Sequence, residues 1–449
     1  MKKRFIYFIA LFLFAITSGF IILKYKSDKN KNESELYSII PRKGNSMNTG
    51  EWILSNKIFT GLLQKIIKNP SDIKSLNGLT AIYLQEARAS GNYSYYDKAA
   101  LNCVNVVLKN DANNFEALTY RAMIYLSQHH FAEGLKVGMQ VQKMYPYNAF
   151  VCGILVDANV ELGNYKAALE DADKMISIRP DIRSYSRISY LREIHGDIRG
   201  AIDAMKLAVD AGSPGTEFTE WARVQLGKLY EQLGEMKYAE MHYTIALDNR
   251  PAYPYALGGL ARIAVAAKDY KKAIALYQQA DSLSNDYSFR EALIEVYKLA
   301  GNETRSFSVA NAVISEMEKA AKAMARGDSS GHYADREMAY AYLAINNGDK
   351  ALEHALLEYN RRPNNIDANE TVAWAYYNRN NYVKAESYIK AALQTNCKNP
   401  ALLCHAGLIY AKTGEKKTAK NYLQEALKNN PNISPLLKAE AGLILKSQM

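Results

Sequence analysis

The stretch from Leu226 to Pro251 reads LGKLYEQLGEMKYAEMHYTIALDNRP and decides how the chain folds. Its marker residues alternate between small, aromatic and chain-breaking types: Gly227, Tyr230, Gly234, Ala239, Tyr243, Ala246 and Pro251. Apolar positions three and four residues apart on both sides of Gly234 predict two amphipathic helices joined by a turn at that glycine. Pro251 predicts the end of the second helix.

The same order of residues recurs along the chain with a period of 34. This interval separates residues of several unrelated types: Ala351, Ala385 and Ala419; Tyr342, Tyr376 and Tyr410; Pro146 and Pro180. One period shared by unrelated residue types predicts a tandem array of helical pairs. Each pair exposes an apolar face that is buried only when its neighbour stacks on it.

These residues resemble the tetratricopeptide repeat family, whose unit is a helix–turn–helix of 34 residues. The stretch 407–431 follows the same pattern. The resemblance implies an all-α fold, a right-handed α-solenoid of about ten tandem repeats with helical caps. We expect the solenoid to span 73–433, with an N-terminal capping helix in 51–72 and a C-terminal capping helix in 434–449.

Composition supports an ordered chain and narrows the classes of function. Of 449 residues, 48% are hydrophobic and 23% charged, the balance of a globular protein, and four Cys exclude a disulfide-stapled scaffold. The chain has 33 Tyr, and much of this excess is interpreted as packing, because Tyr occupies one packing position in seven of ten repeats. The net charge of +10 arises mostly in residues 1–50, which hold nine Lys or Arg and three Asp or Glu. Because the repeats are close to neutral, we expect no nucleic-acid partner.

The N-terminus predicts a membrane anchor. Two lysines and an arginine precede the uncharged stretch 5–23, which as a helix would be about 28 Å long, close to the bilayer core of about 30 Å. We expect 1–23 to be an uncleaved signal-anchor and 24–50 a flexible tether. The body would then lie outside the cytoplasm, on the periplasmic side of a cell membrane crossed once. The alternative is a secreted protein whose signal is cleaved.

Motifs for catalysis are absent from the sequence. It holds no phosphate-binding loop, no G-x-G-x-x-G and no H-E-x-x-H. The pair His129-His130 is expected to be solvated in a loop. Cys397, Cys404 and His405 are interpreted as packing residues, and whether the two cysteines are bridged stays open. We therefore expect no catalytic residue, no metal and no cofactor, and no enzyme.

The resemblance implies that the first helix of each repeat lines a concave groove that takes a peptide. Candidate contacts are basic in the middle repeats and aromatic or charged in the late ones: Arg183, Arg187, Lys228 and Arg262; Tyr333, Arg336, Tyr340, Glu370, Trp374 and Tyr377. Aromatic residues and arginine carry much of the binding energy at protein interfaces. The alternative is that several of these side chains only pack between helices.

The prediction for function is a membrane-tethered scaffold or assembly factor that binds a protein or peptide partner in this groove. A cell-wall or glycan-binding envelope protein is the alternative, because aromatic stripes also stack on sugars.

Overall fold

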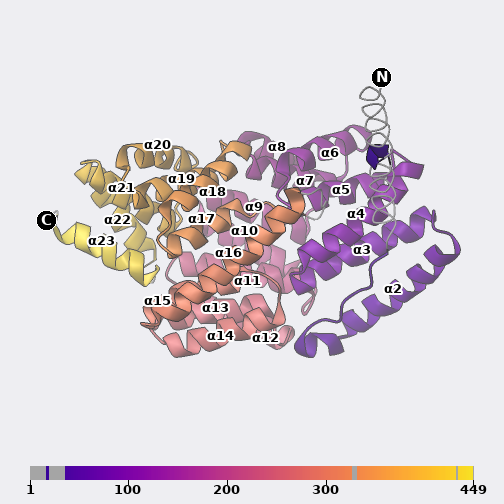
Figure 1. Cartoon of the computed structure of the whole chain (residues 1–449), viewed down its shortest axis with the longest axis horizontal. Coiled ribbons are helices and arrows are strands. Elements are labelled where there is room, and N and C mark those ends of the chain that lie inside the picture. The colour runs from indigo at the N-terminus through magenta and orange to yellow at the C-terminus, as the bar shows by residue number, and fades with distance from the viewer. Residues whose placement is uncertain (1–16, 20–35, 326–330, 431–432, 448–449) are drawn as a thin grey trace, which may run out of the picture.

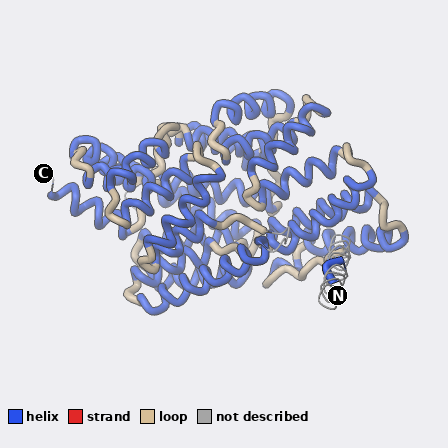
Figure 2. Tube along the Cα trace, turned by 45° about the horizontal axis from the view of Figure 1, so that its top comes forward, coloured by secondary structure: helices blue, strands red, loops and turns tan. Residues whose placement is uncertain are grey.

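The computed structural model of the chain describes residues 17–19, 36–325, 331–430 and 433–447. The regular structure in these ranges is helical, and Figure 2 shows helices joined by short loops. The expected signal-anchor lies outside the described residues, apart from 17–19. None of the helices described is both long enough and apolar enough to cross a membrane.

Within the described ranges, ten helical pairs follow one another (Figure 1). We call the first helix of each pair the A helix: α3 (Ile73–Ser90), α5 (Phe115–Ser127), α7 (Ala149–Glu161), α9 (Ile182–Ile194), α11 (Glu217–Gln232), α13 (Pro254–Ala266), α15 (Ser288–Leu299), α17 (Asp335–Ala344), α19 (Ile366–Asn378) and α21 (Pro400–Lys412). The second is the B helix: α4 (Tyr93–Asn110), α6 (Phe131–Met144), α8 (Tyr165–Ile178), α10 (Ile198–Asp210), α12 (Met236–Asn249), α14 (Tyr270–Leu283), α16 (Glu303–Ala325), α18 (Gly348–Arg361), α20 (Tyr382–Ala392) and α22 (Lys416–Asn429). Two further helices flank the array: α2 (Gly50–Lys68) packs on α3, and α23 (Pro435–Ser447) on α21 and α22. The prediction of an all-α solenoid of about ten helical pairs is confirmed.

Local chemistry sets where each pair turns. Each turn between an A and a B helix holds one residue with a positive φ: Gly91, His129, Gly163, Gly196, Gly234, Lys268, Gly301, Asn346, Asn380 and Gly414. Glycine predominates because it reaches this left-handed conformation without a steric penalty. Asparagines commonly cap the next A helix. The Asn399 side chain, for instance, accepts hydrogen bonds from the backbone N–H groups of Ala401 and Leu402.

Small residues and tyrosines hold the two helices of a pair together. A Cβ added at Gly227 would lie 2.4 Å from the ring of Tyr243, so only glycine permits this close approach. Tyr243 itself is 0% exposed. Tyr230 is also buried, and its ring stacks on that of Tyr238 across the pair at a centroid distance of 5.3 Å. The abundance of tyrosine thus reflects packing between helices.

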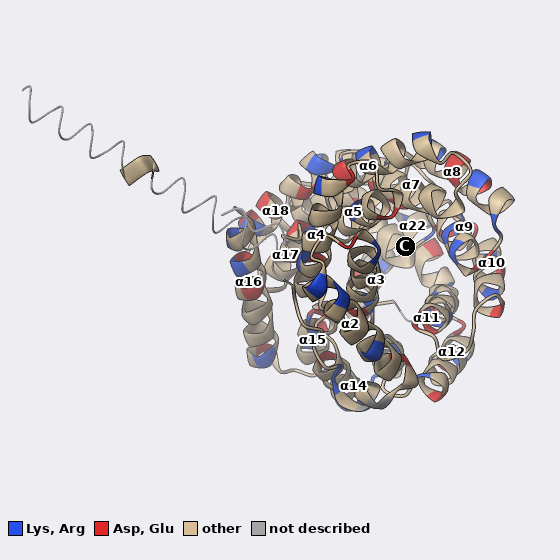
Figure 3. Cartoon of the chain, turned by 90° about the vertical axis from the view of Figure 1, so that its right-hand side faces the viewer, with Lys and Arg blue, Asp and Glu red and all other residues tan. Residues whose placement is uncertain are grey.

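The array coils back on itself. The turn inside one pair therefore touches the segment that precedes the A helix six pairs later. We call this line of contacts the seam. The N–H of Asn285 donates to Ser90 O at 3.1 Å, that of Tyr333 to Gln128 O at 3.2 Å, and that of Ile366 to the Tyr165 hydroxyl at 2.9 Å. A Cβ at Gly196 would lie 2.5 Å from Asn396 O. Figure 3 looks along the coil and shows it as a ring.

The seam corrects the expectation for His129-His130. Instead of lying in solvent, His129 is half-buried, with its ring 4.0 Å from that of His332 and its Nδ1 2.8 Å from Tyr333 O. Burial, together with the neighbouring His332, lowers the pKa of His129 to about 2, so the ring is neutral. This contact could not be predicted from the sequence, because its partners lie about 200 residues away.

Part of the segment expected as a tether lies against the first pair. Arg42 is buried and donates to both carboxylate oxygens of Glu86 at 2.8 Å. It also reaches Glu51 of α2, which in turn accepts from Arg250 at 2.7 Å. The N–H of Ile40 donates to the Tyr96 hydroxyl. A short 3-10 helix, η1 (Gly44–Asn48), follows.

Candidate functional site

The A helices form the inner surface of the coil. In Figure 3, α9 and α11 lie inside α10 and α12, with the B helices facing outward. Side chains of distant pairs therefore approach one another across the inside. Asp367 of α19, for example, acts electrostatically on Tyr190 and Glu193 of α9. The candidate contact residues all come from A helices or from the loops directly before them.

Three of the four middle-repeat cations are held by neighbours. Arg187 forms a two-point ion pair with Asp157, at 2.6 and 2.8 Å. The guanidinium of Arg183 lies 5.3 and 5.2 Å from the rings of Phe150 and Phe218. The third cation, Arg262, donates from Nε to Glu231 at 2.9 Å. These contacts orient the three guanidinium groups, and the ion pairs compensate the charges of Arg187 and Arg262.

Lys228 differs from these arginines. Its side chain is exposed on α11 and makes no ion pair with any described residue. Desolvation by the surrounding protein and the positive charge of Arg262 lower its pKa to about 8. An anionic group supplied from outside the chain would relieve this unfavourable charge.

Most of the late-repeat candidates are packed against other side chains. Trp374 stacks on Tyr377 at 4.7 Å and on His405 at 3.9 Å. The buried Glu370 accepts from His405 at 2.8 Å, and the Tyr377 hydroxyl donates to Glu440 of α23 at 2.6 Å. The packing alternative therefore describes these three residues well, with the half-buried Trp374 the most accessible.

Tyr333 lies in the seam rather than on the inner surface. Its ring stacks on His130 at 4.4 Å, and the Arg361 guanidinium lies 4.2 Å from the ring centroid. Its contacts join two turns of the coil, so the ring is engaged within the chain.

Arg336 and Tyr340 do come together on α17. The guanidinium lies 5.5 Å from the ring centroid of Tyr340, and both side chains are half-buried. Nε of Arg336 is buried without a hydrogen-bond partner among the described residues. An unpaired buried donor is costly, and this one belongs to a half-buried side chain of α17.

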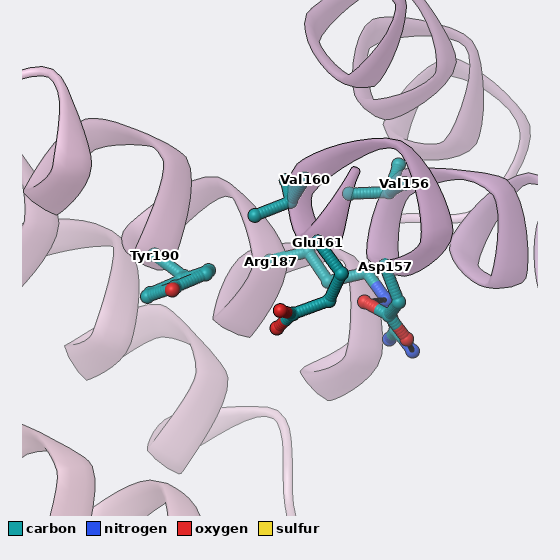
Figure 4. Close-up of a pocket in the computed structure, with 6 residues that line it drawn as sticks. All are labelled: Val156, Asp157, Val160, Glu161, Arg187 and Tyr190. Atoms are coloured by element: carbon teal, nitrogen blue, oxygen red, sulfur yellow. Dashed lines mark hydrogen bonds and ion pairs between the residues drawn. The ribbon is translucent and has the colours of Figure 1, made fainter. Parts of the chain in front are cut away.

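A small pocket opens beside Arg187, between α7 and α9 (Figure 4). Its volume is about 100 Å³, and it is lined by six residues: Val156, Asp157, Val160, Glu161, Arg187 and Tyr190. Only Arg187 was among the sequence candidates. The repeat offers a signal for Tyr190, which stands 38 residues before Lys228 at the comparable place on its A helix, because this repeat is four residues longer than the period. Glu161 gives no such signal, because it is held by an ion pair across the seam with Arg362.

The cysteines and the described acidic groups show no metal chemistry. All four cysteines are free and buried. Among the described residues, no three His, Cys, Asp or Glu side chains gather as a metal site would require.

The fold and its inner surface define a helical-repeat solenoid. Residues 224–288 and 400–433 match family models described as tetratricopeptide repeat, so the chain contains tetratricopeptide repeats. No curated protein matches its sequence.

Solved structures with similar folds include three of different sizes. A tetratricopeptide repeat protein from Parabacteroides merdae is 16% identical, covers 60% of this chain and 98% of its own, and has a TM-score of 0.35. PilW, a type IV pilus biogenesis factor, is 17% identical, with coverages of 45% and 93% and a TM-score of 0.38. The human IFIT1 dimer with PPP-AAAA is 15% identical, with coverages of 72% and 73% and a TM-score of 0.45.

Proposed function

We propose that this protein is a membrane-tethered scaffold or assembly factor that binds a protein or peptide partner on the inner surface of its coil. Tetratricopeptide-repeat domains typically bind proteins and are usually not enzymes. The observation that carries the proposal is Lys228, an exposed inner-surface cation with no ion-pair partner among the described residues. The buried, unpaired Nε of Arg336 supports it from a second A helix.

The glycan alternative needs aromatic faces that are free to stack on sugars. Among the aromatic candidates of the late repeats, Trp374 stacks on both Tyr377 and His405, so its faces are occupied. We therefore favour a protein partner.

The tethering part of the proposal rests on the basic N-terminus and the uncharged stretch 5–23. It places the body outside the cytoplasm. Protease added to intact and to permeabilised cells tests this placement. Digestion of the body only after permeabilisation of the inner membrane would contradict it, and release of the body without detergent would favour cleavage and secretion.

Partner binding is tested by photocrosslinking in cells, with the full chain carrying a photoreactive residue at position 228 or at position 237. Lys237 is exposed on the B helix α12 and makes no ion pair with described residues, so it is the matched outer-surface control. We expect a discrete crosslinked band from position 228, and an Arg262→Glu substitution in the same chain should weaken it. The same bands from both positions would refute the assignment to the inner surface.

A further inference from the structure

The pocket between α7 and α9 presents an exposed aromatic ring beside a carboxylate. Tyr190 is 39% exposed, high for a tyrosine on an A helix, and its hydroxyl makes no hydrogen bond with the described residues. Figure 4 shows the carboxylate of Glu161 pointing toward Tyr190, with Val156 and Val160 forming the apolar side. The pocket of about 100 Å³ is thus part apolar, part aromatic and part acidic.

The charge around Tyr190 is negative. Desolvation raises its pKa well above the ordinary value, and three carboxylates, those of Asp367, Glu161 and Glu193, raise it further. Of these, Asp367 makes no side-chain hydrogen bond or ion pair with the described residues. It belongs to α19, so it approaches the pocket from the second turn of the coil.

The nearby arginines neutralise this charge only in part. Arg336 of α17 acts electrostatically on Asp367 and on Glu161 but forms no ion pair with either carboxylate. Arg187 is committed to Asp157 through two hydrogen bonds. The guanidinium of Arg362 is shared between Glu161 and Glu358. Burial raises the pKa of Glu161 to about 7 in spite of Arg362, with Asp367 adding to the rise. The carboxylate therefore has less positive charge near it than its burial requires.

An exposed aromatic face, unpaired carboxylate charge and a short apolar wall are together complementary to an alkylammonium group. The ring attracts the cation, the carboxylates accept its hydrogen bonds, and the valines cover its methylene stem. The compact ammonium suits so small a pocket better than a planar guanidinium, which favours two-point contact with one carboxylate.

We propose that Tyr190, Glu161 and Asp367 bind an alkylammonium group, supplied by a lysine side chain of the partner. This inference deepens the proposed function and rests on it. The same chemistry would also accept a free small amine, so the experiment separates the two sources.

The test uses the full chain in detergent and two capped peptides, tetralysine and its fully Nε-acetylated counterpart, with n-butylammonium chloride as the free amine. At equal ionic strength we expect tetralysine to bind and the acetylated peptide not to bind. The Tyr190→Leu and Asp367→Asn variants should each weaken tetralysine binding about tenfold, because the first removes the cation–π contact and the second removes a charged acceptor. Asp173→Asn makes the same charge change at an exposed, unpaired position on the outer helix α8 and should leave binding within about twofold.

Unchanged tetralysine binding in both pocket variants, or an equal loss in Asp173→Asn, would overturn the proposal. Matching melting temperatures of the variants and the parent show that a loss of binding is not a loss of fold. Binding of n-butylammonium as tight as that of tetralysine, with the same sensitivity to Asp367→Asn, supports the site and assigns it to a free amine. If tetralysine does not bind but the crosslinks from position 228 persist, only this inference is refuted. If the crosslinks are lost but tetralysine still binds, only the proposed function is refuted.

Discussion

Replacement of Arg362 by methionine tests whether the seam holds the coil closed. The side chain is 5% exposed and pairs with Glu161 on α7 and with Glu358 on α18. Methionine keeps most of the apolar volume and removes the charge. Breaking a buried ion pair costs about 3–5 kcal/mol, because the remaining partner is left uncompensated.

The surroundings of Glu358 and Glu161 narrow the expected loss in the free energy of unfolding. Glu358 keeps a second ion pair, with Arg361 at 2.6 Å, so little of the cost arises there. Glu161 loses its ion pair, yet its side chain is 32% exposed and water can solvate it in part. We therefore expect a loss near the lower end of the range, about 3 kcal/mol, at pH 8 where Glu161 is charged.

Hydrogen exchange at one seam amide measures this loss directly. The N–H of Ile366 donates to the Tyr165 hydroxyl across the seam. A loss of about 3 kcal/mol accelerates its exchange roughly 100-fold if the seam opens locally. Amides in α13, which has no contact with Arg362, should change little.

Arg179→Met is the matched control. Arg179 is 70% exposed and pairs with Asp181 at 3.1 Å, and such a surface pair contributes about 0–1 kcal/mol. If Arg362→Met accelerates the Ile366 amide no more than Arg179→Met does, the closed seam is not the stable state in solution and the reasoning fails.

Three further outcomes follow from the packing and the buried groups. Gly227→Ala should destabilise the protein by about 1–3 kcal/mol in urea unfolding, because the added Cβ meets Tyr243 at 2.4 Å. The control Gly61→Ala, with open space around it, should be neutral or stabilising. Equal effects of the two substitutions would contradict the packing argument. The pKa of Glu161 is about 7 in the folded protein against an ordinary 4.5, so the folded state binds more protons between these values and its free energy of unfolding falls as pH rises through that window. Glu161→Gln should flatten this slope, and an unchanged slope would refute the assignment. The charged groups that act on this carboxyl come from α7, α17, α19 and the loop before α19: Asp157, Arg336, Asp367 and Arg362. All four cysteines should resist a thiol reagent in the native protein and react in urea, since burial raises the pKa of three of them to about 12; only two reactive thiols in urea would reveal a bridge.

Much of the fold could be predicted from the repeat alone. The period locates α13 at Pro254 and α21 at Pro400, where each helix begins with proline. Small residues and tyrosines such as Gly227 and Tyr230 have roles that depend only on the next helix, a few residues away. Because these interactions are local and repeated, they leave a regular pattern in the sequence.

The candidate site was predictable only in part. The A-helix positions that line the inside follow from the repeat, and Lys228, Arg187 and Arg336 lie there as expected of groove residues. The repeat did not show which of these charged side chains form ion pairs. Arg187 meets Asp157 from the previous pair, whereas Lys228 meets no acid close enough for an ion pair among the described residues.

By itself, then, the sequence determined the helices, their pairing and the inner face of each pair. The tertiary structure alone decided how the coil closes: which turns meet at the seam, that His129 is buried against His332, and that Asp367 approaches Tyr190 from another turn. The physical reason is that closure depends on a small rotation between neighbouring pairs, accumulated over six of them. Such a sum is set by every interface at once, and no single residue pattern records it.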